Sequence, residues 1–479
     1  MATARFLAFV VAVLAATSVA WADVATEQRE DSVADADLVL RGQDRRGNFG
    51  RSVAMGDVDG DGIDDLLVGA PNENPGPRDG GVAYLFYGRP GFSGELRTAD
   101  ADVRFDGDAV NLRLGNRVGI GDLNGDGFDD VILGARDSDQ NGRGAGAVHI
   151  FFGAPDLPSV LAATNADTIL LGEGPGDNAG ISLAFLGDVD GDGLGDLGIG
   201  AARYEENAQE RGAAYVLFGR DTWPSEFDLS EADVRLLGDS ARGRFGWSMA
   251  ASDLDGDGLA DVAVGEPNHD NDRFGRISIY LGVDLAPLRP GRATDTPASI
   301  VVDGDTPSQR AGYSLAGGGD FNGDGFEDLL IGAPYDDQAG NEAGSVHLLL
   351  GGPDLAPAST LADAAWHWLG ASELDLTGVG LAFSEGRRYD RVLIGAPSPN
   401  EDHESGGRIY GVYGSREPEG NVSLADVRRA WTPENVGDWL GFSVVADGDL
   451  DGDGRDDLVL AARKNDGLAR SAGSVYVFT

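Results

Sequence analysis

The chain has 479 residues, no cysteine and a net charge of −45, with 81 acidic against 36 basic side chains. A charge this negative argues against nucleic acid as a partner, because phosphates bind to basic surfaces. Without cysteine there are no disulfides to brace an exported chain, so its stability must come from elsewhere.

The N-terminus has the layout of a secretory signal peptide. Arg5 precedes a short apolar run over residues 6–16, and Ala20-Trp-Ala22 forms an A-x-A cleavage site. The run is short for a membrane span, and no later apolar stretch is long enough to cross a bilayer. We therefore predict a signal peptide over 1–22, a disordered polar lead-in over 23–36, and a secreted or periplasmic product without an anchor.

A nine-residue acidic loop then recurs, beginning at residues 57, 122, 188, 253, 320 and 449. Each copy has Asp or Asn at positions one, three and five, Gly at four and six, and Asp at nine. Calcium takes six to eight oxygen ligands, so these side chains, with a backbone carbonyl at position seven, can surround one ion. The glycines permit left-handed turns that point successive carboxylates inward.

This spacing predicts about six calcium ions. In the first copy position twelve is the apolar Val68, where an EF-hand has Glu, and a strand-like run follows, so the loop is not an EF-hand. An acidic turn without an ion would crowd like charges together in every copy, and magnesium demands a tighter octahedron. The predicted ligands are Asp57, Asp59, Asp61, Ile63 and Asp65; Asp122, Asn124, Asp126, Phe128 and Asp130; Asp188, Asp190, Asp192, Leu194 and Asp196; Asp253, Asp255, Asp257, Leu259 and Asp261; Asp320, Asn322, Asp324, Phe326 and Asp328; and Asp449, Asp451, Asp453, Arg455 and Asp457.

The loop spacing also predicts the architecture. The first five copies lie 65 to 67 residues apart, and the last follows after 129, which leaves room for one more repeat. That repeat keeps its strand-like runs at Gly380-Leu-Ala-Phe-Ser and 390–397, but Glu385-Gly-Arg-Arg-Tyr stands where the acids belong. The chain therefore has seven repeats of about 65 residues, and six can bind metal.

Each repeat contains four strand-like runs, one before the acidic loop, one after it, an alternating run that begins at Gly, and a shorter last run. We therefore predict an all-β fold over 37–479, a seven-bladed β-propeller of four-stranded blades. The last repeat stops at Thr479, after its third run. Ala36-Asp-Leu-Val-Leu resembles the fourth-strand segments of other repeats, so we expect this N-terminal strand to complete the last blade and close the ring.

These repeats resemble the FG-GAP repeats of the integrin α-subunit N-terminal propeller. The likeness lies in Phe49-Gly50-x-Ser-Val-Ala, the acidic loop and Gly69-Ala70-Pro71, and Gly-Ala-Pro returns at 332–334 and 395–397. The resemblance implies calcium in the strand-connecting loops and a partner on the opposite face. The chain departs from integrins in the number of its acidic loops, six where three or four are usual.

No nucleophile elbow, zinc motif or phosphate loop points to catalysis. His149 and His347 replace Tyr at the same position of the third strands, which makes them structural. We expect a non-enzymatic, monomeric module that binds an extracellular protein or glycan through the variable loops between second and third strands. Two alternatives remain: an exported calcium-dependent polysaccharide lyase, which needs a Lys/Arg/His cluster on one face, and a structural part of a larger assembly.

Overall fold

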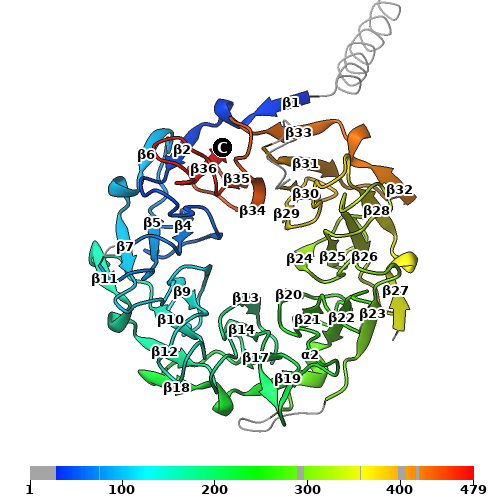
Figure 1. Ribbon diagram of the computed structural model, residues 1–479, viewed down its shortest axis with the longest axis horizontal. Coiled ribbons are helices and arrows are strands. Elements are labelled where there is room, and N and C mark those ends of the chain that lie inside the picture. Colours follow the sequence, from blue (N-terminus) through cyan, green and yellow to red (C-terminus); the bar gives the residue numbers. More distant parts are fainter. Residues whose placement is uncertain are drawn as a thin grey trace, which may run out of the picture.

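The structure is a computed structural model that describes residues 29–74, 76–270, 272–288, 296–355, 358–397, 406–416 and 420–479. Within these ranges seven β-sheets stand as blades around a central opening (Figure 1), which confirms the predicted seven-bladed all-β propeller. The described helical segments are single turns, namely α2 (Gly282–Leu285) and the six 3-10 turns η1 (Val33–Asp35), η2 (Thr98–Asp100), η3 (Ala163–Asn165), η4 (Leu229–Glu231), η5 (Leu361–Asp363) and η6 (Leu424–Asp426). The predicted signal peptide, 1–22, lies outside the described residues.

Each blade begins with two antiparallel strands joined by the acidic loop or its blade 6 counterpart. The first strands of blades 1 to 7 are β3 (Val53–Gly56), β8 (Arg117–Gly121), β13 (Ser182–Gly187), β20 (Ser248–Ser252), β24 (Ser314–Gly319), β29 (Gly380–Ser384) and β34 (Leu440–Gly448). The second strands are β4 (Asp65–Ala70), β9 (Asp130–Ala135), β14 (Asp196–Ala201), β21 (Asp261–Glu266), β25 (Asp328–Ala333), β30 (Arg391–Ala396) and β35 (Asp457–Ala462). The second strands run through the middle of their blades, which is why they read as continuous apolar runs.

Two further antiparallel strands complete each blade toward the rim. The third strands are β5 (Val82–Phe86), β10 (Ala147–Phe151), β17 (Ala213–Leu217), β22 (Arg276–Tyr280), β26 (Ser345–Leu349), β31 (Arg408–Tyr413) and β36 (Ser474–Phe478). The fourth strands are β7 (Val103–Asp106), β12 (Thr168–Leu171), β19 (Val234–Leu237), β23 (Ile300–Asp303), β28 (Trp366–Leu369), β33 (Arg429–Thr432) and, in blade 7, β2 (Leu38–Arg41). In this last pairing Leu38 lies opposite Val477 and Arg41 opposite Ser474.

Six blades gain a fifth, parallel strand that the sequence patterns did not predict. Each fifth strand belongs to the following repeat and lies on the outer edge of the preceding blade, just before that repeat's own fourth strand. These strands are β11 (Val160–Ala162), β18 (Glu226–Asp228), β27 (Ala358–Thr360), β32 (Gly420–Ser423), β1 (Arg29–Ser32) and β6 (Gly94–Arg97), which pair with β7, β12, β23, β28, β33 and β2. Blade 3 also carries a small hairpin, β15 (Glu205–Glu206) with β16 (Gln209–Glu210). The result is a ring in which neighbouring blades overlap.

The predicted disordered lead-in over 23–36 needs correction for its second half. Arg29–Ser32 forms β1, which pairs in parallel with β33, and the η1 turn follows. Val33 is fully buried, and Asp31 lies 3.6 Å from the Nε atom of Arg429. This segment lacks an apolar alternation because backbone pairing, rather than side-chain burial, holds most of it. Residues 23–28 lie outside the described part of the chain.

The hydrophobic core is divided among the joints between blades. Seven clusters of buried side chains occur in the described residues, and each contains residues of two neighbouring blades. The glycine of the Gly-Ala-Pro pattern serves this close packing, because a Cβ atom on Gly69 would lie 2.1 Å from the carbonyl oxygen of Gly115 in the next blade. Stability in this ring therefore depends on every blade contacting both its neighbours.

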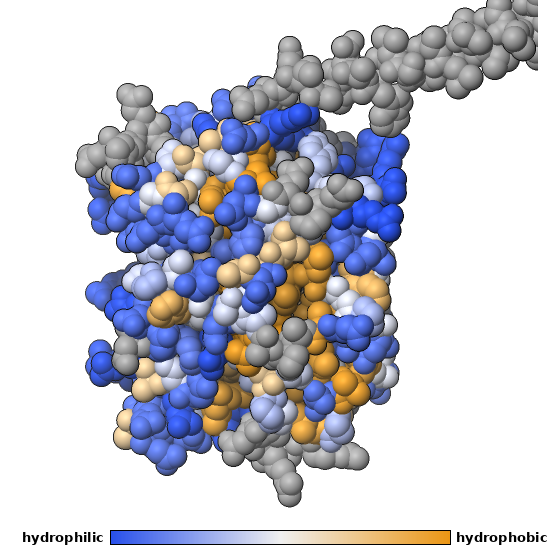
Figure 2. Space-filling view, turned by 90° about the vertical axis from the view of Figure 1, so that its right-hand side faces the viewer, coloured by the Kyte–Doolittle hydropathy of each residue, from blue (hydrophilic) through white to orange (hydrophobic). Residues whose placement is uncertain are grey.

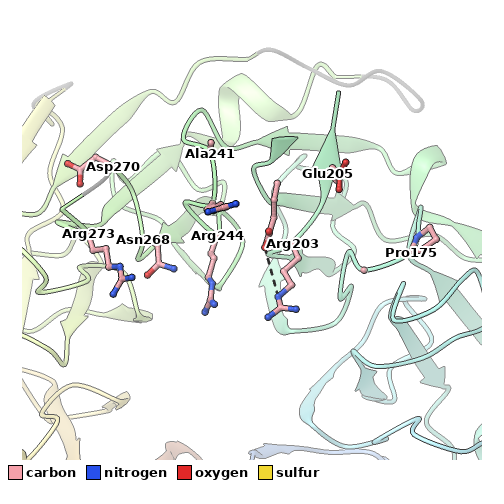
Figure 3. Close-up of a pocket in the computed structure, with 11 residues that line it drawn as sticks. Pro175, Arg203, Glu205, Ala241, Arg244, Asn268, Asp270 and Arg273 are labelled. Carbon is pink, nitrogen blue, oxygen red and sulfur yellow. Dashed lines mark ion pairs between the residues drawn. The ribbon is translucent and has the colours of Figure 1, made fainter. Parts of the chain in front are cut away.

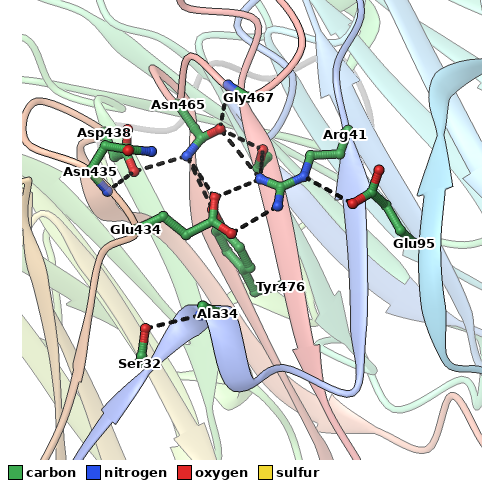
Figure 4. Close-up of polar contacts among 11 residues, drawn as sticks. Ser32, Ala34, Arg41, Glu95, Glu434, Asn435, Asp438, Asn465, Gly467 and Tyr476 are labelled. Atoms are coloured by element: carbon green, nitrogen blue, oxygen red, sulfur yellow. Dashed lines mark hydrogen bonds and ion pairs between the residues drawn. The ribbon is translucent and has the colours of Figure 1, made fainter.

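A polar network anchors β2 where blade 7 meets blade 6 (Figure 4). The Nη1 and Nη2 atoms of Arg41 donate to the two carboxylate oxygens of Glu434 at 2.7 and 2.8 Å. Tyr476 Oη and Asn465 Nδ2 also donate to Glu434, at 2.9 and 3.2 Å. Both members of the ion pair are largely buried, with side-chain exposures of 13% for Arg41 and 18% for Glu434.

Seen edge-on in Figure 2, the rim carries mostly hydrophilic residues, with hydrophobic residues gathered in strips among them. In the described part of the chain no helix is long and apolar enough to cross a membrane.

Candidate metal loops and the opposite face

The acidic loops connect first to second strands, so all six lie on one face of the ring. In four of them the carboxylates at positions one, three and five bring ligand atoms within 4.8 Å of one another. These sets are Asp57, Asp59 and Asp61; Asp188, Asp190 and Asp192; Asp253, Asp255 and Asp257; and Asp449, Asp451 and Asp453. Each set is partly exposed, so an ion from solution can reach it.

Backbone N–H groups hold the first carboxylate of each loop in place. In the first copy Asp57 Oδ1 accepts from Gly60 N at 2.8 Å and from Asp61 N at 3.0 Å, while Oδ2 accepts from Gly62 N at 2.9 Å. Gly60 and Gly62 adopt φ values of 75° and 88°, which side-chain-bearing residues rarely reach. The glycines therefore bend the chain around the carboxylate, as the sequence predicts.

Two loops have Asn at position three. Asn124 Nδ2 donates to Asp126 Oδ2 at 3.0 Å, and Asn322 Nδ2 donates to Asp324 Oδ2 at 2.9 Å. Each amide oxygen accepts the backbone N–H of position five, as the Asp59 carboxylate does in the first loop. The amide thus takes the same place in the loop with one negative charge fewer.

The Asp at position nine is buried at the start of each second strand. In the first copy Asp65 Oδ2 accepts from Val58 N and Oδ1 from Gly88 N, both at 2.9 Å. Burial raises the pKa of Asp65 to about 8, although both hydrogen bonds oppose the shift. Burial likewise raises the pKa to about 7 for Asp130, Asp196, Asp261, Asp328 and Asp457. A nearby cation would offset the cost of keeping these carboxylates ionised.

In five of the seven joints between blades, the acid at position eight of one loop accepts a backbone hydrogen bond from the loop of the preceding blade. Asp129 Oδ2, for example, accepts the Asp57 N–H at 2.9 Å, and Asp64 Oδ2 accepts the Asp449 N–H at 2.7 Å. The same bond runs from Asp253 N to Glu327, from Asp320 N to Asp390 and from Glu385 N to Asp456. Gly195 and Ala260 occupy this position in blades 3 and 4.

Blade 6 replaces the metal loop with protein contacts. Arg391 stands where the other blades have the buried Asp, and Asp390 Oδ1 accepts from Gly386 N at 2.9 Å. The Gly414 N–H, whose counterparts bond to the position-nine carboxylate, donates instead to the Asp390 carbonyl oxygen. Blade 6 thus shows how the repeat folds without an acidic cluster.

The opposite face carries the loops between second and third strands. Over blades 3 and 4 these loops, together with the loops that lead from a fourth strand to the next first strand, line an open polar cavity of about 620 Å³ (Figure 3), whose residues include Arg203, Arg244, Asn268 and Arg273. The three arginine side chains point in one direction in this view. Arg203 Nε lies 4.0 Å from Glu210 Oε1. Arg203, Asn268 and Arg273 belong to the variable loops predicted to form the functional surface, whereas Arg244 lies in the loop between β19 and β20.

A second cavity, of about 260 Å³, occupies the centre of the ring where all seven first strands begin. Its lining includes Arg51, Arg117, Trp247, Tyr313 and Phe442. The Arg51 guanidinium carbon lies 4.5 Å from the centre of the Phe442 ring, and that of Arg463 lies 3.7 Å from the same ring. We call Arg51, Arg117 and Arg463 the central arginine cluster.

The central arginine cluster concentrates positive charge inside an acidic protein. Burial, followed by the charges of Arg117 and Arg463, lowers the pKa of Arg51 well below its usual value. Burial also lowers the pKa of Arg117, and it lowers that of Arg463 to about 10. Among the described residues none of the three forms an ion pair with a carboxylate, and Arg51 Nη1 and Arg463 Nε are buried without a hydrogen-bond partner.

The histidines in strands are packed as the sequence predicts. His149 and His347 are buried, and the Nδ1 atom of His149 lies 3.1 Å from the Ala163 carbonyl oxygen. A separate group, Asp239, Glu266 and His269, brings possible metal ligands together. Arg276 Nη1 already lies 3.1 Å from Asp239 Oδ2, so this group is an ion-pair network with its own cation.

Comparison with known proteins identifies the repeat. The FG-GAP repeat family matches residues 49–86, 114–151, 245–280, 311–349 and 440–478, which span the first three strands of blades 1, 2, 4, 5 and 7. The chain carries FG-GAP repeats. This confirms the resemblance inferred from the sequence, and the acidic loop of each matched blade lies inside an FG-GAP repeat.

Two kinds of protein match about half of this chain. Bovine phosphatidylinositol-glycan-specific phospholipase D is 29% identical over 243 residues, 49% of this chain and 28% of that protein. Integrin alpha-PS2 of Drosophila melanogaster is 31% identical over 233 residues, 47% of this chain and 15% of that protein, and integrin alpha-5 of Xenopus laevis is 31% identical over 232 residues, 45% and 20%. The chain spans less than a third of the length of these relatives, which include both a phospholipase and integrin alpha chains.

The central arginine cluster is the feature that sequence reasoning missed. Each arginine stands alone in its repeat, and only ring closure brings the three together. A signal was present for Arg51 alone, because the residue that follows the repeated Gly at this place is Trp247, Tyr313 or Phe442 in three other repeats. These residues differ while their neighbours stay alike, which is typical of positions that face a ligand or a channel rather than the core. Arg117 and Arg463 stand at other places in their repeats.

Proposed function

We propose that this chain is a secreted, calcium-stabilised FG-GAP propeller that binds an extracellular protein or glycan on the face opposite its acidic loops. The observation that carries the proposal is the polar cavity of about 620 Å³ over blades 3 and 4, which the variable loops of both blades help to line. A cavity on a rigid scaffold, built from loops that differ between repeats, is the usual setting of a binding site. The signal-peptide pattern at 1–22 supports export.

Calcium fits the acidic loops by the chemistry of their donors. Three oxygen-bearing side chains converge in each loop, the glycine turns hold them there, and all donors are the hard oxygens that calcium prefers. Without a cation, three like charges lie together in four of the loops. The ions would act as scaffold, because they would lie on the face away from the cavity.

A single-site variant tests the loops one at a time. We expect Asp324→Ala to remove one calcium ion from the native mass and to lower the melting temperature by a few degrees, because blade 5 loses one position-five ligand while the other blades still close the ring. Asp354→Ala, in an exposed turn of the same blade, is the matched control. An unchanged calcium count in Asp324→Ala would remove this residue from the ligand set.

A binding screen tests the proposed function itself. The mature chain is offered to arrays of extracellular proteins and of glycans, with calcium and with a chelator. We expect calcium-dependent capture of at least one ligand, and we expect Arg244→Gln together with Arg273→Gln to weaken that capture at least tenfold. Capture of nothing by well-folded, calcium-loaded protein would contradict the proposal.

The central arginine cluster favours one alternative, a polysaccharide lyase. Such an enzyme neutralises a uronate carboxylate and abstracts a neighbouring proton, and Tyr313 lines the cavity beside the arginines. Incubation with uronate-containing polysaccharides, followed by absorbance of the unsaturated product, distinguishes the two. Product release that Tyr313→Phe abolishes would assign the lyase reaction and replace the binding module.

A further inference from the structure

We propose that the central arginine cluster binds a single carboxylate group of a ligand that enters from the face opposite the acidic loops. The inference goes beyond the proposed function, because it concerns the central cavity, a second cavity on the same face of the ring. Arginine is suited to this role, because its planar guanidinium matches a carboxylate with two parallel hydrogen bonds.

The first argument is that the cluster holds partly buried positive charges without a counter-charge among the described residues. Three guanidinium groups lie together, partly buried, with none of the described carboxylates paired to them. Partly buried like charges lower the stability of the folded protein unless an opposite charge lies beside them.

The second argument is the unused hydrogen-bonding capacity. Arg51 Nη1 and Arg463 Nε are buried and have no acceptor, and both guanidinium groups are held over the same Phe442 ring at 4.5 and 3.7 Å. Stacking on the ring fixes the planes of the two groups before any ligand arrives. Arg117 differs, because its Nε already donates to the Ile181 carbonyl oxygen at 3.2 Å.

Size and charge narrow the ligand further. The central cavity holds about 260 Å³, enough for one sugar ring or one acidic side chain. A net charge of −45 repels a long polyanion, whereas a local positive centre attracts one short anionic group. Trp247 and Tyr313, with ring centres 5.5 Å apart, add apolar surface for the uncharged part of the ligand.

The experiment uses calorimetry on the calcium-loaded, full-length mature chain with two carboxylates and their neutral analogues. Glucuronate is compared with glucose, and N-acetylglutamate with N-acetylglutamine amide. We expect saturable binding of at least one carboxylate, at least tenfold weaker binding of its neutral analogue, and a higher melting temperature only with the carboxylate. Which acid binds identifies the source of the group as a sugar acid or an acidic side chain.

The test variant is Arg51→Gln with Arg463→Gln, which removes the two guanidinium groups that each have a buried nitrogen without an acceptor and breaks no recorded side-chain hydrogen bond. We expect at least tenfold weaker carboxylate binding, together with a ligand-free melting temperature equal to or above that of the wild type, because like charges are relieved. Arg143→Gln, an exposed arginine in the loop between β9 and β10, is the matched control and should bind as the wild type does.

Three results would overturn the inference. These are no binding of either carboxylate to the wild type, equal binding of the neutral analogues, and a double variant that melts several degrees below the wild type, which would make the arginines structural. If the double variant binds the carboxylate as tightly as the wild type does, the inference fails while the proposed function stands. If the wild type captures no partner yet binds glucuronate, the proposed function fails and the carboxylate site stands.

Discussion

Removing calcium is expected to lower the melting temperature of this protein by roughly 15 °C, the largest single change we predict. A ligand that binds only the folded state stabilises it by about 2.7 kcal/mol at a hundredfold excess over its Kd, so six independent sites contribute about 16 kcal/mol. At an unfolding entropy of about 2.1 cal/mol/K per residue, this energy corresponds to the stated shift. Differential scanning calorimetry with and without a chelator measures it.

Two controls make the calcium experiment specific. Readdition of calcium should restore the melting temperature in proportion to the logarithm of its concentration, and magnesium at the same concentration should restore much less. Blade 6 is not expected to depend on calcium, because a hydrogen bond from Gly386 N to the Asp390 carboxylate holds its turn. Equal melting of the calcium-loaded and chelated protein would show that the loops are not structural sites.

Arg41→Met is expected to reduce the free energy of unfolding by about 3 kcal/mol, measured by urea denaturation in calcium. The substitution keeps the length of the side chain but leaves Glu434 without its bidentate partner in a largely buried place, which is costly for an ion pair of this kind. The network lies where β2 joins blade 7, so the substitution weakens the contact between blades 6 and 7 that completes the ring.

A second variant isolates the ion pair from other roles of Arg41. Glu95 lies 3.8 Å from Arg41 Nε and is half exposed, so Glu95→Gln should change the free energy of unfolding by less than about 1 kcal/mol. Arg41→Met combined with Glu434→Leu should be more stable than Arg41→Met alone, because no buried charge is left unpaired. If Arg41→Met unfolds at the wild-type urea concentration, the network does not stabilise the joint.

The blades were predictable because repetition turns weak local patterns into a strong one. Each second strand is a continuous apolar run beginning at the last Asp of a loop, and β4, β9 and β14 all begin there in the structure. The fifth strands escaped prediction for the opposite reason. β6, for example, has mostly exposed side chains, so its sequence carries no periodic apolar signal, and only backbone pairing with β2 defines it.

The acidic loops could be predicted from the sequence, whereas the central arginine cluster could not. All side chains of one loop lie within nine residues, so a contiguous pattern is enough to predict their convergence. Arg51, Arg117 and Arg463 come from the first, second and seventh blades, and they meet only once the ring is complete. Position-eight acids such as Asp129 lie between these cases, because they look like part of the loop but bond to the neighbouring blade.

Because the blades overlap, the N-terminal segment 29–41 pairs with two neighbouring blades. β1 covers the edge of blade 6 and β2 forms the last full strand of blade 7, so detachment of residues 29–41 uncovers β33 and β36 together. Bare strand edges are templates for another chain. The same segment of a second molecule fits both edges in the correct register, which makes this joint the place where two rings can exchange strands and become an intertwined dimer.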